Sequence, residues 1–397
     1  MPHVIEPGAM LGVLGGGQLG AMFAAAARRL GYRVAVWDPD EEAPALHLAD
    51  LDIVAPFTSD NALARFCQGI AAATYEWENV PASLAEAVQA RVPLRPSARV
   101  LGIVQNRLSQ KSFLAEHLIP VSPFQPVRSA ADLAVPDRLG FPCLCKTATA
   151  GYDGKGQWRL TKSRDVEVLK ADLTKLPSSA GPWVLEQFVD FEKELSVLVV
   201  RSESGERRSY LPSENLHEEG ILRWTRAPAD LDPRVARGAV ELAEAVVEVL
   251  EGVGVFCVEL FLQRGGRLLV NEVAPRPHNS GHYTLDACTV SQFEQQVRVI
   301  CGLPLGETRQ HRAAVMVNLI GEDIRAVGGG TGLVGLMQMP NAKLHVYGKR
   351  VVRARRKMGH VTFLADKPEE AWEQADEVIS LLRQARNQSG RSSLGSV

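Results

Sequence analysis

Two glutamates lie on neighbouring arms of a predicted β-hairpin late in the chain. Glu259 belongs to the apolar run VGVFCVELFLQ and Glu272 to RLLVNEVAP, and Gly265-Gly266 between the runs predicts a two-residue turn. The hairpin would bring both carboxylates to the same point on adjacent strands. Because the charges repel unless a cation joins them, and because carboxylate oxygens suit Mg2+, we interpret the pair as metal ligands. The alternative is two acids on a solvent-facing sheet, which fits their apolar neighbours less well.

A glycine-rich loop follows a lysine that ends another predicted strand. Lys146 lies at the end of FPCLCKT, and the loop from there to Gln157 contains three glycines, Gly151, Gly154 and Gly156, together with small residues. Bare backbone N–H groups suit phosphates, and a lysine can reach them as a point charge. The segment is not a P-loop, because no Gly-Lys-Ser/Thr opens a helix here. A plain β-hairpin loop is the alternative.

The segment WVLEQFVDFEKELSV adds two more acids. Glu186 closes one apolar run and Glu194 begins the next. A segment that bends between strands can offer backbone groups to a purine edge and a free acid to a ribose hydroxyl. From this segment alone, however, ordinary edge-strand charge is the preferred interpretation.

The N-terminal string GGGQLG matches much of a dinucleotide-binding fingerprint. Gly15, Gly17 and Gly20 follow an apolar run and open an Ala-rich helix, and Asp38 ends the next run. A helix N-terminus of this kind binds an anion. A nicotinamide-dependent oxidoreductase, in which Asp38 would hold the ribose, is one interpretation, but Gln18 fits less well against a pyrophosphate. If the turn binds another phosphate instead, Asp38 is an ordinary strand-end residue.

The elements that must position these residues change in kind along the chain. Residues 10–95 alternate apolar runs with helical patterns, which predicts a parallel sheet. From about residue 120 the runs read as antiparallel strands. We expect an N-terminal Rossmann-like parallel-sheet domain over 1–107, a central α+β domain with antiparallel sheets over 108–312, a small β-rich C-terminal domain over 313–385 and a disordered tail over 386–397.

Composition excludes several classes of protein. The net charge of the 397 residues is −2, which gives no reason to expect nucleic acid or an anionic membrane as a partner. No apolar run approaches the roughly twenty residues that span a bilayer, and the N-terminus lacks a signal-peptide pattern. Six cysteines in a chain of this length form no disulfide framework. We therefore expect a cytoplasmic protein.

Order and spacing together resemble the ATP-grasp superfamily, in which two lobes hold ATP between antiparallel sheets. The strings GGGQLG, TYEWENV, GYDGKGQ, FEKELSV, NEVAPRPHNSGH and RRKMGH resemble the N5-carboxyaminoimidazole ribonucleotide synthetase family within it, from about residue 10 to 365. The resemblance implies ATP- and bicarbonate-dependent carboxylation of aminoimidazole ribonucleotide in purine biosynthesis, through carboxyphosphate. It also implies Mg2+ as cofactor, no nucleic-acid or membrane partner, and a homodimer.

The resemblance also implies roles for individual residues. The expected ATP-binding residues are Arg107, Lys146, Gly151, Tyr152, Asp153, Gly154, Lys155, Gly156, Gln157, Glu186, Gln187, Phe188, Val189, Glu194, His217, Asn271 and Glu272. Those expected to bind aminoimidazole ribonucleotide are Gln18, Leu19, Glu76, Tyr152, Asp153, Arg276, His278, Lys349 and Arg356. Catalysis is expected of Asp153, Arg276 and Lys349, and Mg2+ is expected to bind Glu259 and Glu272.

Three assignments stay open at this point. Asp153 would handle a proton of the attacking amine, and the loop with Tyr152 would close over the site. Whether Arg356 or Lys357 faces inward is undecided. Rival functions are a neighbouring ATP-grasp ligase, an inactive nucleotide-binding relative and the oxidoreductase.

Overall fold

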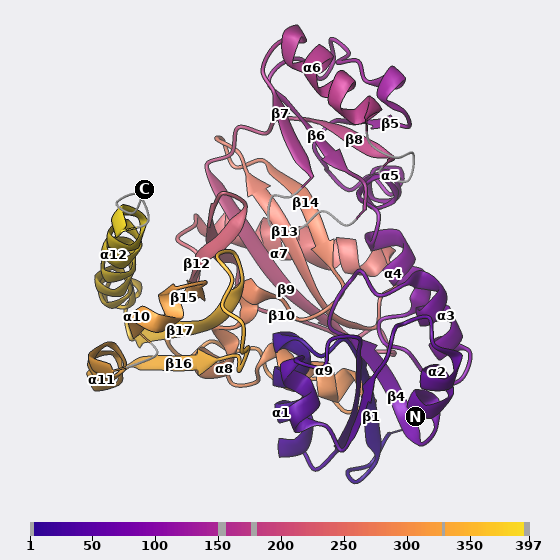
Figure 1. The fold of residues 1–397 in the computed structure, drawn as a ribbon, viewed down its shortest axis with the longest axis vertical. Helices are drawn as coiled ribbons and strands as arrows, with labels where there is room; N and C mark the ends of the chain where they lie inside the picture. The colour runs from indigo at the N-terminus through magenta and orange to yellow at the C-terminus, as the bar shows by residue number, and fades with distance from the viewer. Residues whose placement is uncertain (1–3, 150–155, 176–180, 328–329, 393–397) are drawn as a thin grey trace.

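Three β-sheets organise the part of the chain that the computed structural model describes, residues 4–149, 156–175, 181–327 and 330–392 (Figure 1). The N-terminal sheet is parallel, with the order β3-β2-β1-β4. Its strands are β1 (Met10–Leu14), β2 (Arg33–Asp38), β3 (Leu51–Val54) and β4 (Ile70–Tyr75). Helices α1 (Gln18–Arg29), α2 (Asp60–Cys67) and α3 (Ala82–Gln89) connect and cover them. The predicted Rossmann-like domain is confirmed.

The order of this sheet places its functional loops together. The chain passes from β1 to β2 on one side and returns to β4 on the other, so the loops that follow β1 and β4 are adjacent. Ligands of parallel sheets bind at such a switch point, beyond the carboxyl ends of the strands. The glycine turn after β1 and Glu76 after β4 therefore face the same space.

Two helices connect this domain to the rest, α4 (Ala98–Val104) and α5 (Arg107–Glu116). They are separated at Asn106, whose side chain accepts hydrogen bonds from the N–H groups of Leu108 and Ser109. This N-cap starts a new helix at Arg107. The cap thus fixes the direction in which Arg107 leaves the backbone.

A small antiparallel sheet has the order β5-β8-β6-β7 and forms a separate lobe with helix α6 (Ser163–Thr174). Its strands are β5 (Phe124–Val127), β6 (Cys143–Thr147), β7 (Gln157–Leu160) and β8 (Trp183–Gln187). Alternate side chains of β6, Cys143 and Cys145, pack with Leu169 of α6 in the core of this lobe. Lys146 follows Cys145 directly on the strand, so its side chain points to the opposite face.

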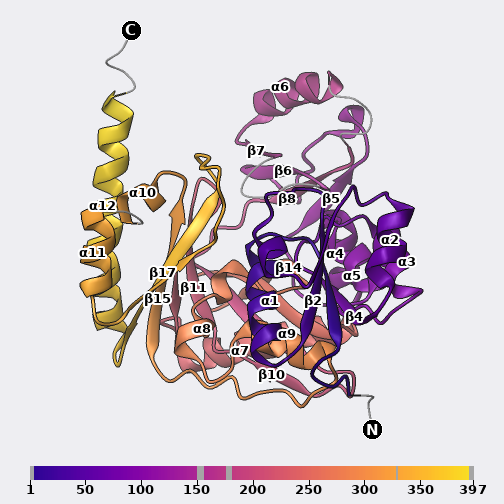
Figure 2. The ribbon, with the colours of Figure 1, turned by 60° about the horizontal axis from the view of Figure 1, so that its bottom comes forward.

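The third sheet has nine strands in the order β14-β13-β9-β11-β12-β15-β17-β16, with β10 beside β9. The strands of its first part are β9 (Lys193–Arg201), β10 (Arg207–Ser209), β11 (Ser213–Glu218), β12 (Ile221–Ala227), β13 (Gly254–Leu262) and β14 (Leu268–Ala274). Val197 of β9 packs against helix α7 (Pro233–Val249), and Leu198 packs in the cluster with helix α9 (Gln292–Ile300). The sheet is thus covered on both faces, and α9 also packs against α1 of the N-terminal domain (Figure 2).

Three strands form the predicted small β-rich C-terminal part of the chain. β15 (Ala313–Ile320), β16 (Ala342–Val346) and β17 (Lys357–Ala365) continue the large sheet, because β15 pairs with β12. Helices α10 (Asp323–Val327), α11 (Gly330–Gln338) and α12 (Pro368–Ser392) accompany them. α12 continues past residue 386, so the prediction of a disordered tail is wrong for 386–392, and 393–397 lie outside the described residues.

The hairpin of β13 and β14 pairs Glu259 directly with Glu272, as predicted. The turn itself differs, because the N–H of Gln263 bonds the carbonyl of Arg267, which leaves residues 264–266 as a three-residue loop. Gly265 and Gly266 have φ angles of 87° and 84°, which glycine adopts without strain. Among the described residues, no helix has the length and apolarity needed to cross a membrane.

Candidate active site

Two adjoining cavities lie between these domains. The larger cavity, of about 610 Å3, opens between the small sheet and the first part of the large sheet. The smaller cavity, of about 480 Å3, opens between the N-terminal domain and the loop from β16 to β17. The side chains that line both cavities are Glu78, Arg276, His278, Asn279 and Lys357. We call these residues the shared wall.

Lys146 is held in the larger cavity by a buried carboxylate. Its Nζ lies 3.1 Å from Oε2 of Glu186, and Nζ of Lys111 lies 3.5 Å from the same oxygen. Burial would raise the pKa of Glu186, but the two ammonium groups outweigh it and lower this pKa to about 2. The prediction that an acid here is free for a ribose hydroxyl is therefore wrong for Glu186. This carboxylate aims the lysine instead.

The two paired acids, Glu259 and Glu272, face one another in the larger cavity. Burial is the main reason that the pKa of Glu259 rises to about 7, and the facing Glu272 raises it further. Arg107 donates to Glu272 at 2.6 Å and partly neutralises the pair. Such crowding of carboxylate oxygens is relieved by a divalent cation, so the donor set fits Mg2+. Within the described ranges, no three or more His, Cys, Asp and Glu side chains form a metal-holding cluster, so phosphate oxygens and water would complete the shell.

The larger cavity also contains an ion pair and aromatic rings. His217 of β11 contacts the carboxylate of Glu194, and this contact raises the pKa of His217 against the opposing effect of burial. Phe191 and Phe261 stack with their centroids 4.8 Å apart. An acid beside flat apolar rings can take a ribose and a purine base. The two phenylalanines were not among the predicted residues.

The glycine loop is described only at its end. Gly156 has a φ of 68°, and a Cβ there would lie 2.6 Å from Oγ1 of Thr147. Only glycine fits this close approach, which closes the hairpin of β6 and β7. The predicted residues Gly151, Tyr152, Asp153, Gly154 and Lys155 lie outside the described residues.

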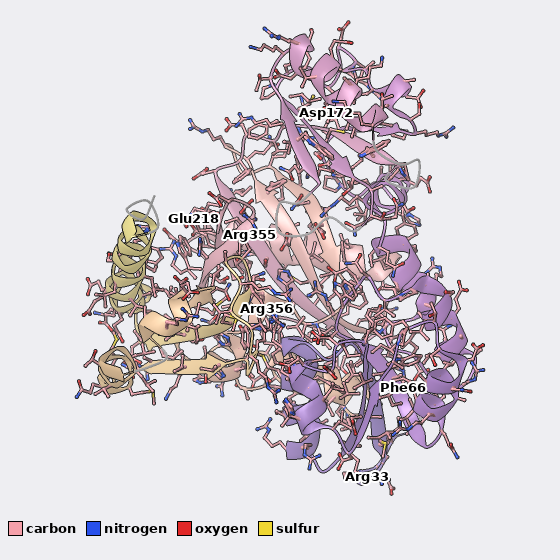
Figure 3. All side chains as sticks on the ribbon, in the orientation of Figure 1. Arg33, Phe66, Asp172, Glu218, Arg355 and Arg356 are labelled. Atoms are coloured by element: carbon pink, nitrogen blue, oxygen red, sulfur yellow. The ribbon has the colours of Figure 1, made fainter. Side chains whose placement is uncertain are left out.

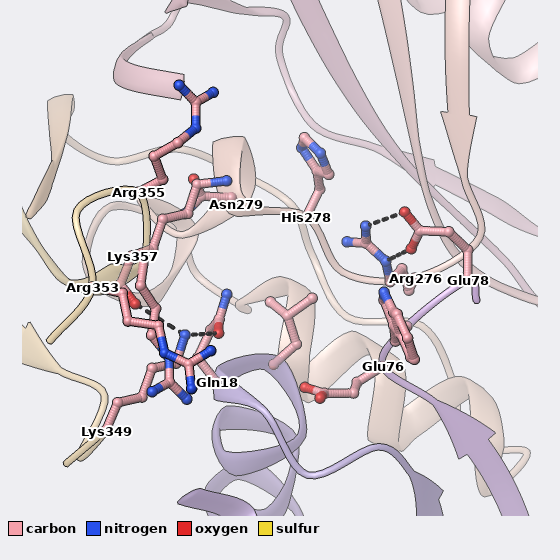
Figure 4. Close-up of a pocket in the computed structure, with 13 residues that line it drawn as sticks. Gln18, Glu76, Glu78, Arg276, His278, Asn279, Lys349, Arg353, Arg355 and Lys357 are labelled. Carbon is pink, nitrogen blue, oxygen red and sulfur yellow. Dashed lines mark hydrogen bonds and ion pairs between the residues drawn. The ribbon is translucent and has the colours of Figure 1, made fainter. Parts of the chain in front are cut away.

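The smaller cavity is strongly basic on one side. Lys349 donates to Oε1 of Gln18 at 2.6 Å and to the carbonyl of Lys357 at 2.9 Å, so it joins the C-terminal strands to the N-terminal domain (Figure 4). Figure 3 labels Arg355 and Arg356 near one another, toward the middle of the view. The connection from β16 to β17, together with the first residue of β17, supplies the cations that line this cavity, and we call this segment the basic loop. They are Lys349, Arg353, Arg355, Arg356 and Lys357. Both Arg356 and Lys357 therefore reach the cavity, which answers the question left open above.

Three amides of the glycine turn are already bonded to carboxylates. Glu76 accepts hydrogen bonds from the N–H groups of Gly17 and Gly20, the latter at 2.5 Å. Asp38 accepts from Gly16 at 2.6 Å, so it braces the turn and is not an ordinary strand-end residue. Because carboxylates already satisfy these amides, a phosphate is better placed at the basic loop.

The shared wall contains an ion pair and a neutral histidine. Arg276 donates from Nε and Nη2 to the two carboxylate oxygens of Glu78. Burial, and secondly the charge of Arg276, hold the pKa of His278 well below its ordinary value. Its Nε2 lies 3.4 Å from Glu259. The wall thus brings a fixed guanidinium and a neutral imidazole between the two cavities.

Most predicted residues line the cavity expected of them. The larger cavity is lined by Arg107, Lys146, Gln157, Phe188, Glu194, His217, Glu259, Asn271 and Glu272. The smaller cavity is lined by Gln18, Leu19, Glu76, Arg276, His278, Lys349 and Arg356. The predicted residues Gly156, Glu186, Gln187 and Val189 are absent from these linings, and the lining residues not predicted include Trp77, Glu78, Arg159, Phe191, Phe261, Asn279, Arg353 and Arg355.

These features define a class of enzyme. A lysine on a small antiparallel sheet, facing paired acids on a larger one across a cleft, is the arrangement of an ATP-grasp ligase. Family models agree: an ATP-grasp domain matches residues 112–293, a ribonucleotide synthetase preATP-grasp domain 9–105, and a phosphoribosylaminoimidazole carboxylase C-terminal domain 314–374.

Individual relatives narrow the class further. The N5-carboxyaminoimidazole ribonucleotide synthase of Brucella melitensis is 41% identical, in a match that covers 90% of this chain and 97% of that protein. The synthase of Bacillus subtilis is 39% identical, in a match that covers 93% of this chain and 95% of that protein. A crystal structure of the Aspergillus clavatus N5-carboxyaminoimidazole synthase with ADP and 5-aminoimidazole ribonucleotide has a TM-score of 0.86 at 30% identity, covering 95% of this chain and 99% of the other. This chain belongs to the N5-carboxyaminoimidazole ribonucleotide synthase family.

Proposed function

We propose that this chain carboxylates 5-aminoimidazole ribonucleotide to N5-carboxyaminoimidazole ribonucleotide, with consumption of ATP and bicarbonate, in purine biosynthesis. The observation that carries the proposal is the shared wall. There the larger cavity, with its lysine and paired acids, and the basic smaller cavity meet at one arginine and one histidine. The larger cavity takes ATP and the smaller takes the ribonucleotide. An intermediate formed in one can then react in the other without release.

The larger cavity suits ATP at both ends. Phe191 and Phe261 offer an apolar surface for the base, and Glu194 can accept from a ribose hydroxyl. Lys146, aimed by Glu186, is placed for phosphate oxygens. Glu259 and Glu272 would hold Mg2+, which when bound neutralises charge on the phosphates and orients the terminal one.

The smaller cavity suits an anionic ribonucleotide. The basic loop around Lys349 and Arg356 would hold its phosphate, and Glu76 its ribose hydroxyls. Gln18, bonded to Lys349, ties the two sides of the cavity together. The exocyclic amine would then point toward Arg276 and His278 in the shared wall.

The chemistry proceeds in two steps. A bicarbonate oxygen attacks the terminal phosphorus of ATP and ADP leaves, which gives carboxyphosphate. The amine nitrogen then bonds to the carboxyl carbon, either directly or after release of CO2, the bond from that carbon to the phosphate oxygen breaks, and phosphate leaves. Arg276 stabilises the developing negative charge, and exclusion of water limits hydrolysis of carboxyphosphate. The amine loses a proton, for which Asp153, outside the described residues, stays our proposal.

The proposal is tested by ADP release with ATP, bicarbonate and Mg2+, with and without 5-aminoimidazole ribonucleotide. We expect release to rise when the ribonucleotide is added, together with formation of the carboxylated product. ADP release that glycinamide ribonucleotide and formate stimulate instead would support a neighbouring ATP-grasp ligase. Consumption of NADH with no ADP release would contradict the proposal altogether.

We also propose that the enzyme works in the cytoplasm as a homodimer. Both statements are supported by the family resemblance of the sequence, since purine biosynthesis uses small substrates that need no membrane or nucleic-acid partner. Sedimentation equilibrium of the purified chain tests the dimer. A single species with the mass of one chain, 43.2 kDa, would contradict it.

A further inference from the structure

Glu78 occupies a position that the proposed chemistry has not yet used. It follows β4 in the N-terminal domain, whereas its partner Arg276 follows β14 in the large sheet. Both side chains line both cavities. Their ion pair therefore joins two domains at the point where a reactive intermediate would pass (Figure 4).

The geometry of the pair fixes the guanidinium completely. Glu78 accepts from Nε and, at 2.8 Å, from Nη2 of Arg276. Nη1 donates to the carbonyl of Pro277 at 3.1 Å. A planar fork held on two edges cannot rotate, so its remaining N–H bonds keep one direction. Because the side chain of Arg276 is only 14% exposed, solvent does not compete strongly for them.

The charge state of Glu78 decides whether this residue accepts a proton or only holds Arg276 in place. Burial would raise the pKa of this carboxyl, but Arg276 lowers it below its ordinary value. A carboxylate held ionised by a bidentate arginine is a poor acceptor for the proton of the attacking amine. Its remaining contribution is to hold Arg276 in place.

We propose that Glu78 is a positioning residue, which sets the orientation of Arg276 toward the carboxyl group in transit from the larger to the smaller cavity. The inference rests on the proposed function, because it assigns Arg276 to that intermediate. Since Glu78 belongs to the N-terminal domain that also holds the ribonucleotide, the same contact keeps the acceptor and the arginine in register. Its loss should leave ATP cleavage but allow carboxyphosphate to escape or hydrolyse.

The test is the Glu78→Gln variant, assayed separately for ADP and for carboxylated product. We expect product formation to fall roughly tenfold to a hundredfold, as for a small misplacement of a catalytic group. The KM for ATP should stay within about twofold, and the ratio of ADP to product should rise. The matched control is Glu248→Gln, since Glu248 pairs with Arg201 and Arg207 away from both cavities. It should change neither quantity.

Two further results separate positioning from other roles. In an Arg276→Lys background, which removes the planar fork, Glu78→Gln should have little additional effect. An equal effect in that background, or the same ADP-to-product ratio as the unaltered chain, would overturn the inference. Loss of one limb of the pH–rate profile in Glu78→Gln would assign proton transfer instead and overturn it as well. If the unaltered chain releases no ADP in response to the ribonucleotide, the proposed function fails first and the inference fails with it.

Discussion

The contact of Glu186 with Lys146 and Lys111 predicts a stability effect of known sign. Glu186 is 3% exposed, so solvent screening is slight. Its ordinary pKa of 4.5 falls to about 2 in the folded chain. A lowered pKa contributes stability that is complete above the unfolded value and is lost as the pH falls from 4.5 toward 2.

The magnitude follows from the size of this fall. One pKa unit corresponds to about 1.36 kcal/mol, so the ionised Glu186 contributes about 3 kcal/mol at pH 7. At pH 3 the same linkage leaves about 1.4 kcal/mol. The Glu186→Gln variant should therefore lose about 3 kcal/mol at pH 7, in the range found when one partner of a buried ion pair is removed. At pH 3 it should differ much less from the unaltered chain.

Hydrogen exchange measured by mass spectrometry reports this effect locally. Peptides that cover β6 and β8 give the opening free energy of the small sheet, which has its own core. The control is Asp172→Asn in the same lobe, whose ion pair with Lys175 joins side chains that are 60% and 74% exposed. That change should cost less than about 1 kcal/mol. Unchanged protection of β6 and β8 in Glu186→Gln, or a loss that does not depend on pH, would refute the reasoning.

Three further predictions concern the two cavities. Glu272→Gln removes one acid of the predicted metal pair without loss of volume, so ADP release should fall by roughly a hundredfold or more while the melting temperature is kept; retained turnover would argue against the metal assignment. Gly156→Ala should destabilise the β6–β7 hairpin by about 1–2 kcal/mol from its positive φ, and more from contact with Thr147. The control is Gly69→Ala, because Gly69 has a φ of 87° and open space around it, so this change reports the cost of the positive φ alone. Equal losses of stability in melting measurements of the two variants would exclude a cost from contact with Thr147. Lys349→Met should raise the KM for the ribonucleotide roughly tenfold to a hundredfold and leave the KM for ATP unchanged. If steady-state kinetics instead show a raised KM for ATP and an unchanged KM for the ribonucleotide, the assignment of the two substrates to the two cavities must be reversed.

Local patterns in the sequence determined a large part of this protein. The alternation of strands and helices fixed the parallel sheet, because side-chain periodicity depends only on neighbouring residues. The facing of Glu259 and Glu272 was predictable because a hairpin pairs residues close in the chain. The position of Lys146 near a strand end before a glycine loop was also predictable, because an apolar run followed by glycines is a pattern of neighbouring residues.

Only the tertiary structure decided how distant segments combine. Glu78 and Arg276 are 198 residues apart, and nothing in either local pattern indicates that they meet. The partner of Glu186 was likewise hidden, since a strand pattern does not show which charge faces it across a sheet. The C-terminal strands join the large sheet through β12, a pairing that their own local pattern does not indicate. Pairing between strands that are far apart in the sequence depends on the packing of whole domains. The local periodicities of a single sequence do not indicate which of these strands pair.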